Sequence, residues 1–202
     1  TSGITLALSP QVCAQAVKTL RRFRENGALI SFDVNFRANL WSEADARAAI
    51  EQVLPDIDIL FISEESCRKM FARQGELRDI LRDFARIYDL KIVATTQRQV
   101  NSPSSHDFTS LLYDKKTDDF YTEPPYRNIQ VVDRIGSGDA YVAGVLYTVL
   151  AGLDRQQAVS YGNAMAALKS TVAGDLPCTD LDEVQRMIAD HQQGGGRSEM
   201  NR

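Results

Sequence analysis

Residues 131–147, VVDRIGSGDAYVAGVLY, join the end of an apolar strand to a helix through a turn that contains two glycines. The apolar run at 129–133 predicts the strand, and the helical apolar spacing over 139–150 predicts the helix. Gly136 and Gly138 permit backbone conformations that other residues avoid, and they let a ligand come close to the main chain. The stretch therefore predicts a strand–turn–helix unit with an accessible helix start.

The start of this helix has the features of an anion site. Successive N–H groups of a glycine-rich turn can point at one anion, and the helix dipole adds about half a positive charge. We expect this anion hole to consist of Gly136, Ser137 and Gly138. Asp139 then has two interpretations: it caps the helix, or it accepts a proton from an alcohol during phosphoryl transfer. No Lys-Ser or Lys-Thr follows, and Tyr141 stands where the dinucleotide fingerprint needs glycine, so neither of those motifs applies.

The remaining apolar runs alternate between helical and strand periods, which predicts an α/β fold with parallel strands. The helices are predicted at 10–25, 42–54, 64–72, 76–88, 138–151, 154–170 and 180–190. The strands are predicted at 4–8, 28–35, 56–63, 91–96 and 129–133, with 108–114 and 119–123 as an antiparallel pair. The polar stretch at 97–107 predicts a loop, and 192–202 predicts a disordered tail.

Composition excludes several classes of function. The 202 residues are 44% hydrophobic, and 23 basic against 27 acidic side chains give a net charge of -4 without a basic stripe, so we expect no nucleic-acid partner. The apolar runs are too short to cross a membrane, which predicts a cytoplasmic protein without a membrane partner. Three distant cysteines and two histidines without ligand spacing predict neither a disulfide framework nor a zinc site.

Four separated segments resemble the ribokinase-like PfkB family of carbohydrate kinases. The D-x-x-G-x-G-D run at 133–139 is similar to the family signature, and FDVNFRANLW (32–41) resembles a segment of the 2-keto-3-deoxygluconate kinases. SGITLAL (2–8) and AGDLP (173–177) fit the same subgroup. The resemblance implies a ribokinase-like three-layer α/β fold, with a mostly parallel central sheet flanked by helices. It also implies transfer of the ATP γ-phosphate to a sugar-acid hydroxyl, with 2-keto-3-deoxygluconate as the first choice and its 6-phosphate as product.

The resemblance assigns roles residue by residue. It implies that Asp139 is the catalytic base, and it implies an anion hole at the three residues before it. Arg37 stands where the subgroup places an arginine for the substrate carboxylate, although a solvated arginine would look the same. Asp175 matches an acid near the substrate, with a turn or cap role as the alternative. Asn163 matches a position that borders the adenine, with an ordinary surface Asn as the alternative.

The cofactors that the resemblance implies are ATP and Mg²⁺, but the chain departs from the family where magnesium is organised. An N-x-x-E run of the family is replaced by Ser63-Glu64-Glu65-Ser66, which is also a good helix start, so we assign no metal ligand. Arg134 replaces a small hydroxyl residue, which disfavours a bound monovalent cation beside Asp133.

The chain resembles only part of a family member. It opens without methionine, and the N-terminal strands and lid of the family are missing, so we expect residues 1–191 to be the C-terminal part of a kinase domain in a longer protein. Homo-oligomers would form through that absent lid. Alone, the chain is expected to bind nucleotide weakly and to turn over poorly. The alternatives are a kinase of a neutral sugar such as fructose or ribose, which Arg37 disfavours, and a non-catalytic nucleotide-binding remnant.

Overall fold

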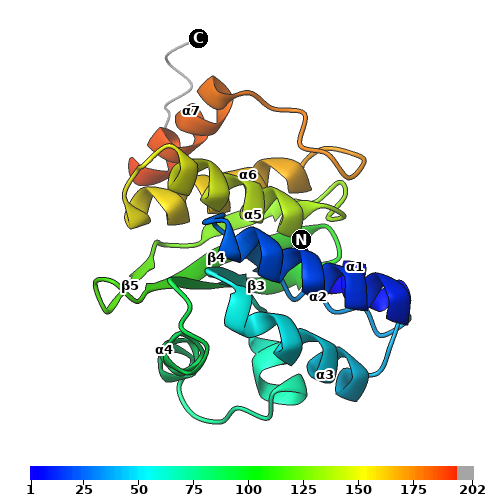
Figure 1. Ribbon diagram of the computed structural model, residues 1–202. Coiled ribbons are helices and arrows are strands. Elements are labelled where there is room, and N and C mark those ends of the chain that lie inside the picture. The colour runs from blue at the N-terminus through cyan, green and yellow to red at the C-terminus, as the bar shows by residue number, and fades with distance from the viewer. Residues whose placement is uncertain (195–202) are drawn as a thin grey trace, which may run out of the picture. The chain divides into compact units, whose positions relative to one another are not determined.

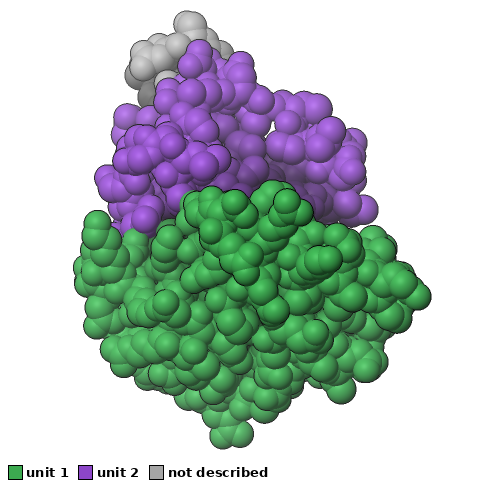
Figure 2. All heavy atoms as spheres, in the orientation of Figure 1, with its two compact units in different colours: residues 1–96, 111–120 green, residues 97–110, 121–202 purple. Residues whose placement is uncertain are grey.

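The computed structural model describes residues 1–194, and the chain has a mixed α/β fold with a sheet flanked by helices (Figure 1). The chain forms two compact units, coloured separately in Figure 2. Unit 1 contains residues 1–96 and 111–120, and unit 2 contains residues 97–110 and 121 onward. In the sheet the strand order is β1-β2-β3-β4-β5, and β6 pairs with β4.

Three parallel strands form the centre of unit 1. These strands are β1 (Ser31–Asp33), β2 (Ile59–Phe61) and the first half of β3 (Ile92–Ser102). In the register, Leu60 lies opposite Phe32 on one side and Val93 on the other. All three residues are fully buried, as expected for strands covered on both faces.

The helices of unit 1 begin and end largely where the sequence predicts. They are α1 (Gly3–Ala7), α2 (Pro10–Glu25), α3 (Glu43–Val53) and α4 (Leu77–Ile87), with the short turns η1 (Leu54–Asp56) and η2 (Ser66–Met70) between the last two. Ser9 and Ser42 cap α2 and α3 by accepting hydrogen bonds from the main chain three residues later. The helix predicted at 64–72 contains a single π-type turn, η2, and is shorter than expected.

The strand predicted at 4–8 is wrong, because these residues lie largely in the short helix α1. Ser2 alone forms an isolated parallel bridge, to Asp33. Gly3 and Leu6 are buried at a helical spacing, and a Cβ on Gly3 would lie 2.1 Å from the Val34 carbonyl oxygen. A run of five residues is too short for its apolar period to separate helix from strand, so packing decides.

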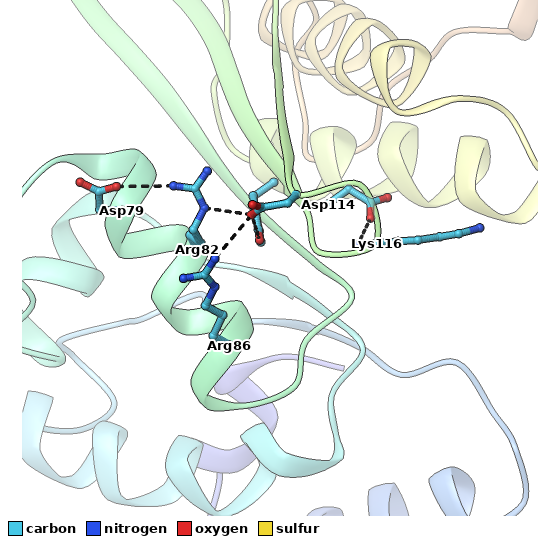
Figure 3. A network of polar contacts seen from close by, with 7 residues as sticks. Asp79, Arg82, Arg86, Asp114 and Lys116 are labelled. Carbon is cyan, nitrogen blue, oxygen red and sulfur yellow. Dashed lines mark hydrogen bonds and ion pairs between the residues drawn. The ribbon is translucent and has the colours of Figure 1, made fainter.

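The outer face of α4 is held to the turn that follows β4 by charged side chains (Figure 3). Arg82 pairs with Asp118 at 3.0 Å and with Asp79 on its own helix at 3.7 Å. Tyr113 donates a hydrogen bond of 2.6 Å to the same Asp118, and the Lys116 amide donates to Asp114. Asp79 and Asp118 are largely exposed, so their ion pairs with Arg82 orient the turn and add little to stability.

The loop predicted at 97–107 is also wrong, since most of it forms a β-hairpin of unit 2. β3 continues to Ser102, and two residues separate it from β4 (Ser105–Asp114). Asn101 donates a hydrogen bond of 2.6 Å to Asp107 across the hairpin. Most side chains at 97–101 are polar and all five are exposed, so the alternating apolar pattern that marks a strand is missing.

β5 (Asp119–Thr122) neighbours β4 in the sheet, as the sequence predicts. β6 (Tyr126–Gln130) pairs antiparallel with β4 and ends three residues earlier than the predicted strand. The predicted boundary is wrong because the amides of Val132 and Asp133 bond the Ser170 carbonyl oxygen instead of a strand.

Two long helices, α5 (Ser137–Leu150) and α6 (Arg155–Ser170), run side by side in unit 2 (Figure 1). They approach closely through glycines: a Cβ on Gly144 would lie 2.5 Å from the Tyr161 carbonyl oxygen, and one on Gly162 would lie 2.7 Å from the Tyr141 ring.

α7 (Leu181–Gln192) follows α6 in the chain. The predicted tail lies outside the described residues from 195 onward, and its first residue, Gln192, still belongs to α7. Among the described residues, none of the helices combines the length and apolar character needed to span a bilayer.

Candidate active site

The turn between β6 and α5 is fixed by main-chain bonds and by one carboxylate. The Val131 amide bonds the Ser104 carbonyl oxygen at 2.9 Å, which completes the sheet edge, and the Ser137 amide bonds the Arg134 oxygen at 3.2 Å. The Asp133 side chain accepts from the Ile135 amide at 3.0 Å. The chain is therefore held through the turn before the helix begins.

Gly136 and Gly138 serve different purposes in this turn. Gly136 is the residue before the helix and has φ +80°, and a Cβ there would lie 1.9 Å from the Asp175 carbonyl oxygen. Nothing lies within 4 Å of a Cβ built on Gly138. Gly136 is thus required by the fold, whereas Gly138 leaves open space into which a ligand could approach.

The start of α5 has free hydrogen-bond donors. The first bond inside the helix runs from the Ala140 amide to the Gly136 oxygen at 2.8 Å, and no side chain caps the helix. The amides of Gly138 and Asp139 therefore have no helical acceptor, and the helix dipole favours an anion there. Of the three residues predicted for the anion hole, Gly138 has a free amide, whereas the Ser137 amide bonds the Arg134 oxygen. The anion-hole role of Gly136, Ser137 and Gly138 stays a prediction.

Asp139 does not cap the helix, because Gly136 occupies the cap position and no side chain bonds to the helix start. Asp139 is the third residue of α5 and is exposed. Its carboxylate has no hydrogen bond or ion pair within residues 1–194. A free carboxylate beside unpaired N–H donors can accept a proton from a hydroxyl that approaches an anion bound at those donors.

A second loop, residues 171–175, reaches the same turn. The Gly174 amide donates to Asp133 Oδ2 at 3.2 Å, and the main chain of Asp175 lies against Gly136. The structure thus brings the predicted residue Asp175 next to the anion turn, with its side chain exposed. The amide of Ile135 above all, then that of Gly174, and then the Lys169 ammonium lower the pKa of the Asp133 carboxyl, which stays ionised.

Positive charge gathers in the part of unit 2 that contains this turn. His106 is 5% exposed, and its pKa is lowered by burial first and then by Arg98 and Arg134. Partial desolvation of the otherwise exposed Arg98, and then the charge of Arg134, also lower the pKa of Arg98. Mutual repulsion of this kind raises the affinity of the region for a bound anion.

Asn163 lies inside unit 2 and not on its surface. Its side chain is fully buried, and Nδ2 donates to Glu123 Oε1 at 2.8 Å. Ser160 donates to Glu123 Oε2 at 2.8 Å, while Oδ1 of Asn163 has no partner in the described chain. The predicted adenine contact stays a prediction, and the side chain observed here ties α6 to the segment after β5.

Arg37 belongs to unit 1 and follows β1. Asn35, at φ 38°, turns the chain, and its amide bonds Asp33 Oδ1 at 3.1 Å. Arg37 is exposed, and its Nη1 donates to the Phe36 oxygen at 3.1 Å, which leaves the rest of the guanidinium in solvent. Its carboxylate-binding role is compatible with this position and stays a prediction.

The segment Ser63–Ser66 is used as a helix start. Ser63 Oγ accepts from the Ser66 amide at 3.1 Å and bonds Ser66 Oγ at 2.9 Å. Glu65 pairs with Lys69 at 2.6 Å, which lowers the pKa of the carboxyl through the hydrogen bond first and the charge second. Within residues 1–194 no group of three His, Cys, Asp or Glu side chains could hold a metal ion.

The profile of the pfkB family carbohydrate kinases matches residues 1–181. The chain belongs to this family. It is 35% identical over 188 residues to a 2-dehydro-3-deoxygalactonokinase of Haloferax volcanii, covering 93% of this chain and 56% of that protein. The chain therefore spans little more than half the length of this pfkB relative.

Two solved pfkB structures are similar to the chain. One is a PfkB family carbohydrate kinase from Listeria grayi, with a TM-score of 0.88 and 32% identity over 94% of this chain and 59% of that one. The other is a 2-dehydro-3-deoxygluconokinase from Thermotoga maritima, with a TM-score of 0.87 and 26% identity over 93% and 58%. The predicted family and its ribokinase-like fold are confirmed.

Two residues of this region were missed by the sequence analysis. Lys169 is fully buried at the end of α6, three residues after the buried Ala166, so its position in the apolar stripe was a usable signal. Glu123 receives two side-chain bonds from α6. It lies in a short proline-containing connection, where no local pattern marks it.

Proposed function

We propose that the full-length protein transfers the γ-phosphoryl group of ATP to a hydroxyl of a sugar acid, with 2-keto-3-deoxygluconate and its 6-phosphate as first choice. The observation that carries this proposal is the exposed, unpaired Asp139 beside the uncapped start of α5. An acid that served only as a helix cap would accept hydrogen bonds from the amides at the helix start. The Asp139 carboxylate accepts none from them.

In this mechanism Asp139 takes the proton from the attacking hydroxyl as the hydroxyl oxygen bonds to the γ-phosphorus. The bond from that phosphorus to the bridging oxygen of ATP breaks in the same step, and ADP leaves. The free amides of Gly138 and Asp139, together with the dipole of α5, stabilise the negative charge on the transferred group. Because Gly136 and the 171–175 loop fix the turn beforehand, these donors need little reorganisation during the reaction. Arg98 and Arg134 add positive charge that favours the nucleotide phosphates.

Mg²⁺ would enter as part of the MgATP substrate, held mainly by phosphate oxygens and water. The serines of Ser63–Ser66 bond each other, and Glu65 is paired with Lys69, so this segment offers no ready set of ligands. The proposed nucleotide site therefore depends on main-chain donors and cationic side chains more than on a protein-held metal.

The substrate class follows from Arg37 and from the relatives. The planar guanidinium of Arg37 suits two parallel hydrogen bonds to a carboxylate, which a neutral sugar does not offer. The Haloferax relative and the Thermotoga structure both have names of keto-deoxy sugar-acid kinases. Fructokinases of plants are more distant, at 25–28% identity.

The test is a coupled ADP-release assay on the full-length protein with 2-keto-3-deoxygluconate, its galactonate epimer, fructose and ribose. We expect kcat/KM for the sugar acids to exceed that for the neutral sugars by at least about 100-fold, because only the sugar acids offer a carboxylate to pair with the Arg37 guanidinium. Arg37→Lys should raise the sugar-acid KM about tenfold or more. Arg22→Lys, on the exposed face of α2, is the matched control and should change nothing.

Preference for fructose or ribose would instead support a neutral-sugar kinase. Nucleotide binding without transfer to any acceptor would support the non-catalytic remnant.

A further inference from the structure

Lys169 is a lysine whose burial needs an explanation. Its side chain is fully buried, which lysine almost never tolerates without a paired charge. Nζ donates to the carbonyl oxygens of Asp133, at 3.0 Å, and Val172, at 3.2 Å. Within residues 1–194 no carboxylate oxygen lies at ion-pair distance from it, so carbonyl dipoles alone hold the ammonium.

The two carbonyl groups belong to the two loops that meet at the anion turn. Asp133 begins the turn that leads to Gly136, and Val172 belongs to the 171–175 loop, which places Asp175 against Gly136. The Gly174 amide bonds the Asp133 carboxylate between the same two loops. The Lys169 ammonium therefore adds to a link that already joins the donors of α5 to the segment that supports them.

We propose that Lys169 is a positioning residue of the kinase site, a tethered cation that joins the Asp133 and Val172 loops and holds the anion turn in place without a bound metal ion. A cation that coordinates carbonyl oxygens from two loops does what a monovalent ion such as K⁺ would do in the same place. Because Lys169 is part of the chain, its positive charge is present at every salt concentration. This inference rests on the proposed kinase function for its catalytic consequence.

The experiment compares the full-length wild type with Lys169→Ala, which removes the ammonium and leaves its space, and Lys169→Met, which fills that space with an uncharged chain. Activity is measured in potassium, ammonium and choline chloride at one ionic strength. Lys18→Met, on the exposed face of α2, is the matched control.

We expect the wild type to be equally active in the three salts within twofold. Both Lys169 variants should lose about 100-fold in kcat, the scale of a misplaced catalytic geometry, with a smaller change in sugar KM. Potassium or ammonium should restore Lys169→Ala at least tenfold over choline and should not restore Lys169→Met. Lys18→Met should match the wild type.

A wild type that needs potassium would overturn the proposal, as would a folded Lys169→Ala that keeps its activity or that no cation restores. Should the variants fail to fold, the salt comparison on the wild type alone still decides.

Hydrogen exchange separates this inference from the proposed function. The amides of 134–139 should exchange at least tenfold faster in Lys169→Ala than in wild type, while those in the middle of α7 stay unchanged. If the amides of 134–139 exchange in Lys169→Ala at the wild-type rate, the proposal that Lys169 holds the anion turn in place is overturned. A wild type that phosphorylates no sugar acid defeats the proposed function instead.

Discussion

α5 and α6 are consecutive helices packed against each other, yet they begin in opposite ways. At the start of α6, Asp154 accepts from the Gln157 amide at 2.8 Å and Gln157 Oε1 accepts from the Asp154 amide at 3.1 Å, a complete capping box. At the start of α5, Gly136 leaves the amides without a side-chain partner. The difference teaches that a helix start can be closed for stability or left open for a ligand.

Each helix start also has an aspartate, which makes the comparison testable. Asp154 bonds its own helix, and Asp139 bonds nothing in the described chain although it lies within the first turn. The same residue type therefore has a stabilising role in one place and, by our proposal, a chemical role in the other.

The largest effect is expected from Asp139→Asn in the full-length protein. Loss of a general base should lower kcat by about two to four orders of magnitude, while nucleotide affinity stays the same or rises because a negative charge leaves the phosphate site. Steady-state kinetics and calorimetric titration with ADP measure both. Asp154→Asn is the control and should retain activity, since Asn caps as well as Asp. Near wild-type turnover in Asp139→Asn would remove the catalytic assignment.

A second effect separates the two glycines of the open start. Gly136→Ala should lower the free energy of unfolding by about 3 kcal/mol, because a Cβ at φ +80° also meets the Asp175 carbonyl oxygen. Gly138→Ala should change it by less than about 0.5 kcal/mol and should instead weaken nucleotide binding, since its Cβ enters the open space. Urea denaturation and ADP titration measure these quantities. Equal stability losses in the two variants would contradict the division of roles.

A smaller effect, on the free energy of unfolding, tests whether Asp154 and Asp139 cap their helices. Asp154→Ala should lower the free energy of unfolding by about 1 kcal/mol, the usual loss for a removed cap. Asp139→Ala should lower it by less than about 0.5 kcal/mol. Thermal unfolding of both variants beside the wild type gives the answer, and a larger loss in Asp139→Ala would show that this carboxylate does cap α5.

The smallest effect is a pH dependence of the open start. Hydrogen bonds from two amides hold the pKa of Asp133 below its usual value of 3.8, so the ionised carboxylate stabilises the fold above that pH. This contribution should disappear as the pH falls below 3.8 and the carboxylate takes up its proton. The stability difference between wild type and Asp133→Asn should therefore shrink between pH 5 and about pH 3 in urea denaturation. A difference that stays constant over this range would show that the carboxylate adds no pH-dependent stability.

Much of the fold was predictable because short stretches of sequence mark where the helices begin. Ser9, Ser42 and Asp154 each stand directly before an apolar helical period, and the helices begin at those positions. The strand–turn–helix unit at Gly136 was also predictable, since the two glycines mark the turn, whereas the sequence alone left open whether Asp139 caps the helix. The hairpin at 97–107 was not, because its strands are held by main-chain bonds and one Asn101–Asp107 contact without an apolar face.

Site residues could be predicted where the chemistry of the side chain itself indicates a role. They could not be predicted where the role depends on contacts with residues far away in the sequence. No local sequence pattern indicates that the buried Asn163 side chain donates a hydrogen bond to Glu123, forty residues earlier in the chain. Nor does any such pattern indicate that the main chain of Asp175 would lie on Gly136. Such contacts depend on the packing of α6 and the loop after it.

The glycines between α5 and α6 have a consequence for motion. With no side chain at Gly144 or Gly162, the helices touch along their backbones, and neither can rotate or slide without steric clash. We therefore expect the pair to travel as one rigid body in any opening or closing of the full-length enzyme. α5 with Asp139, the proposed base, and α6 with Lys169 would then keep the same relative orientation during such a motion.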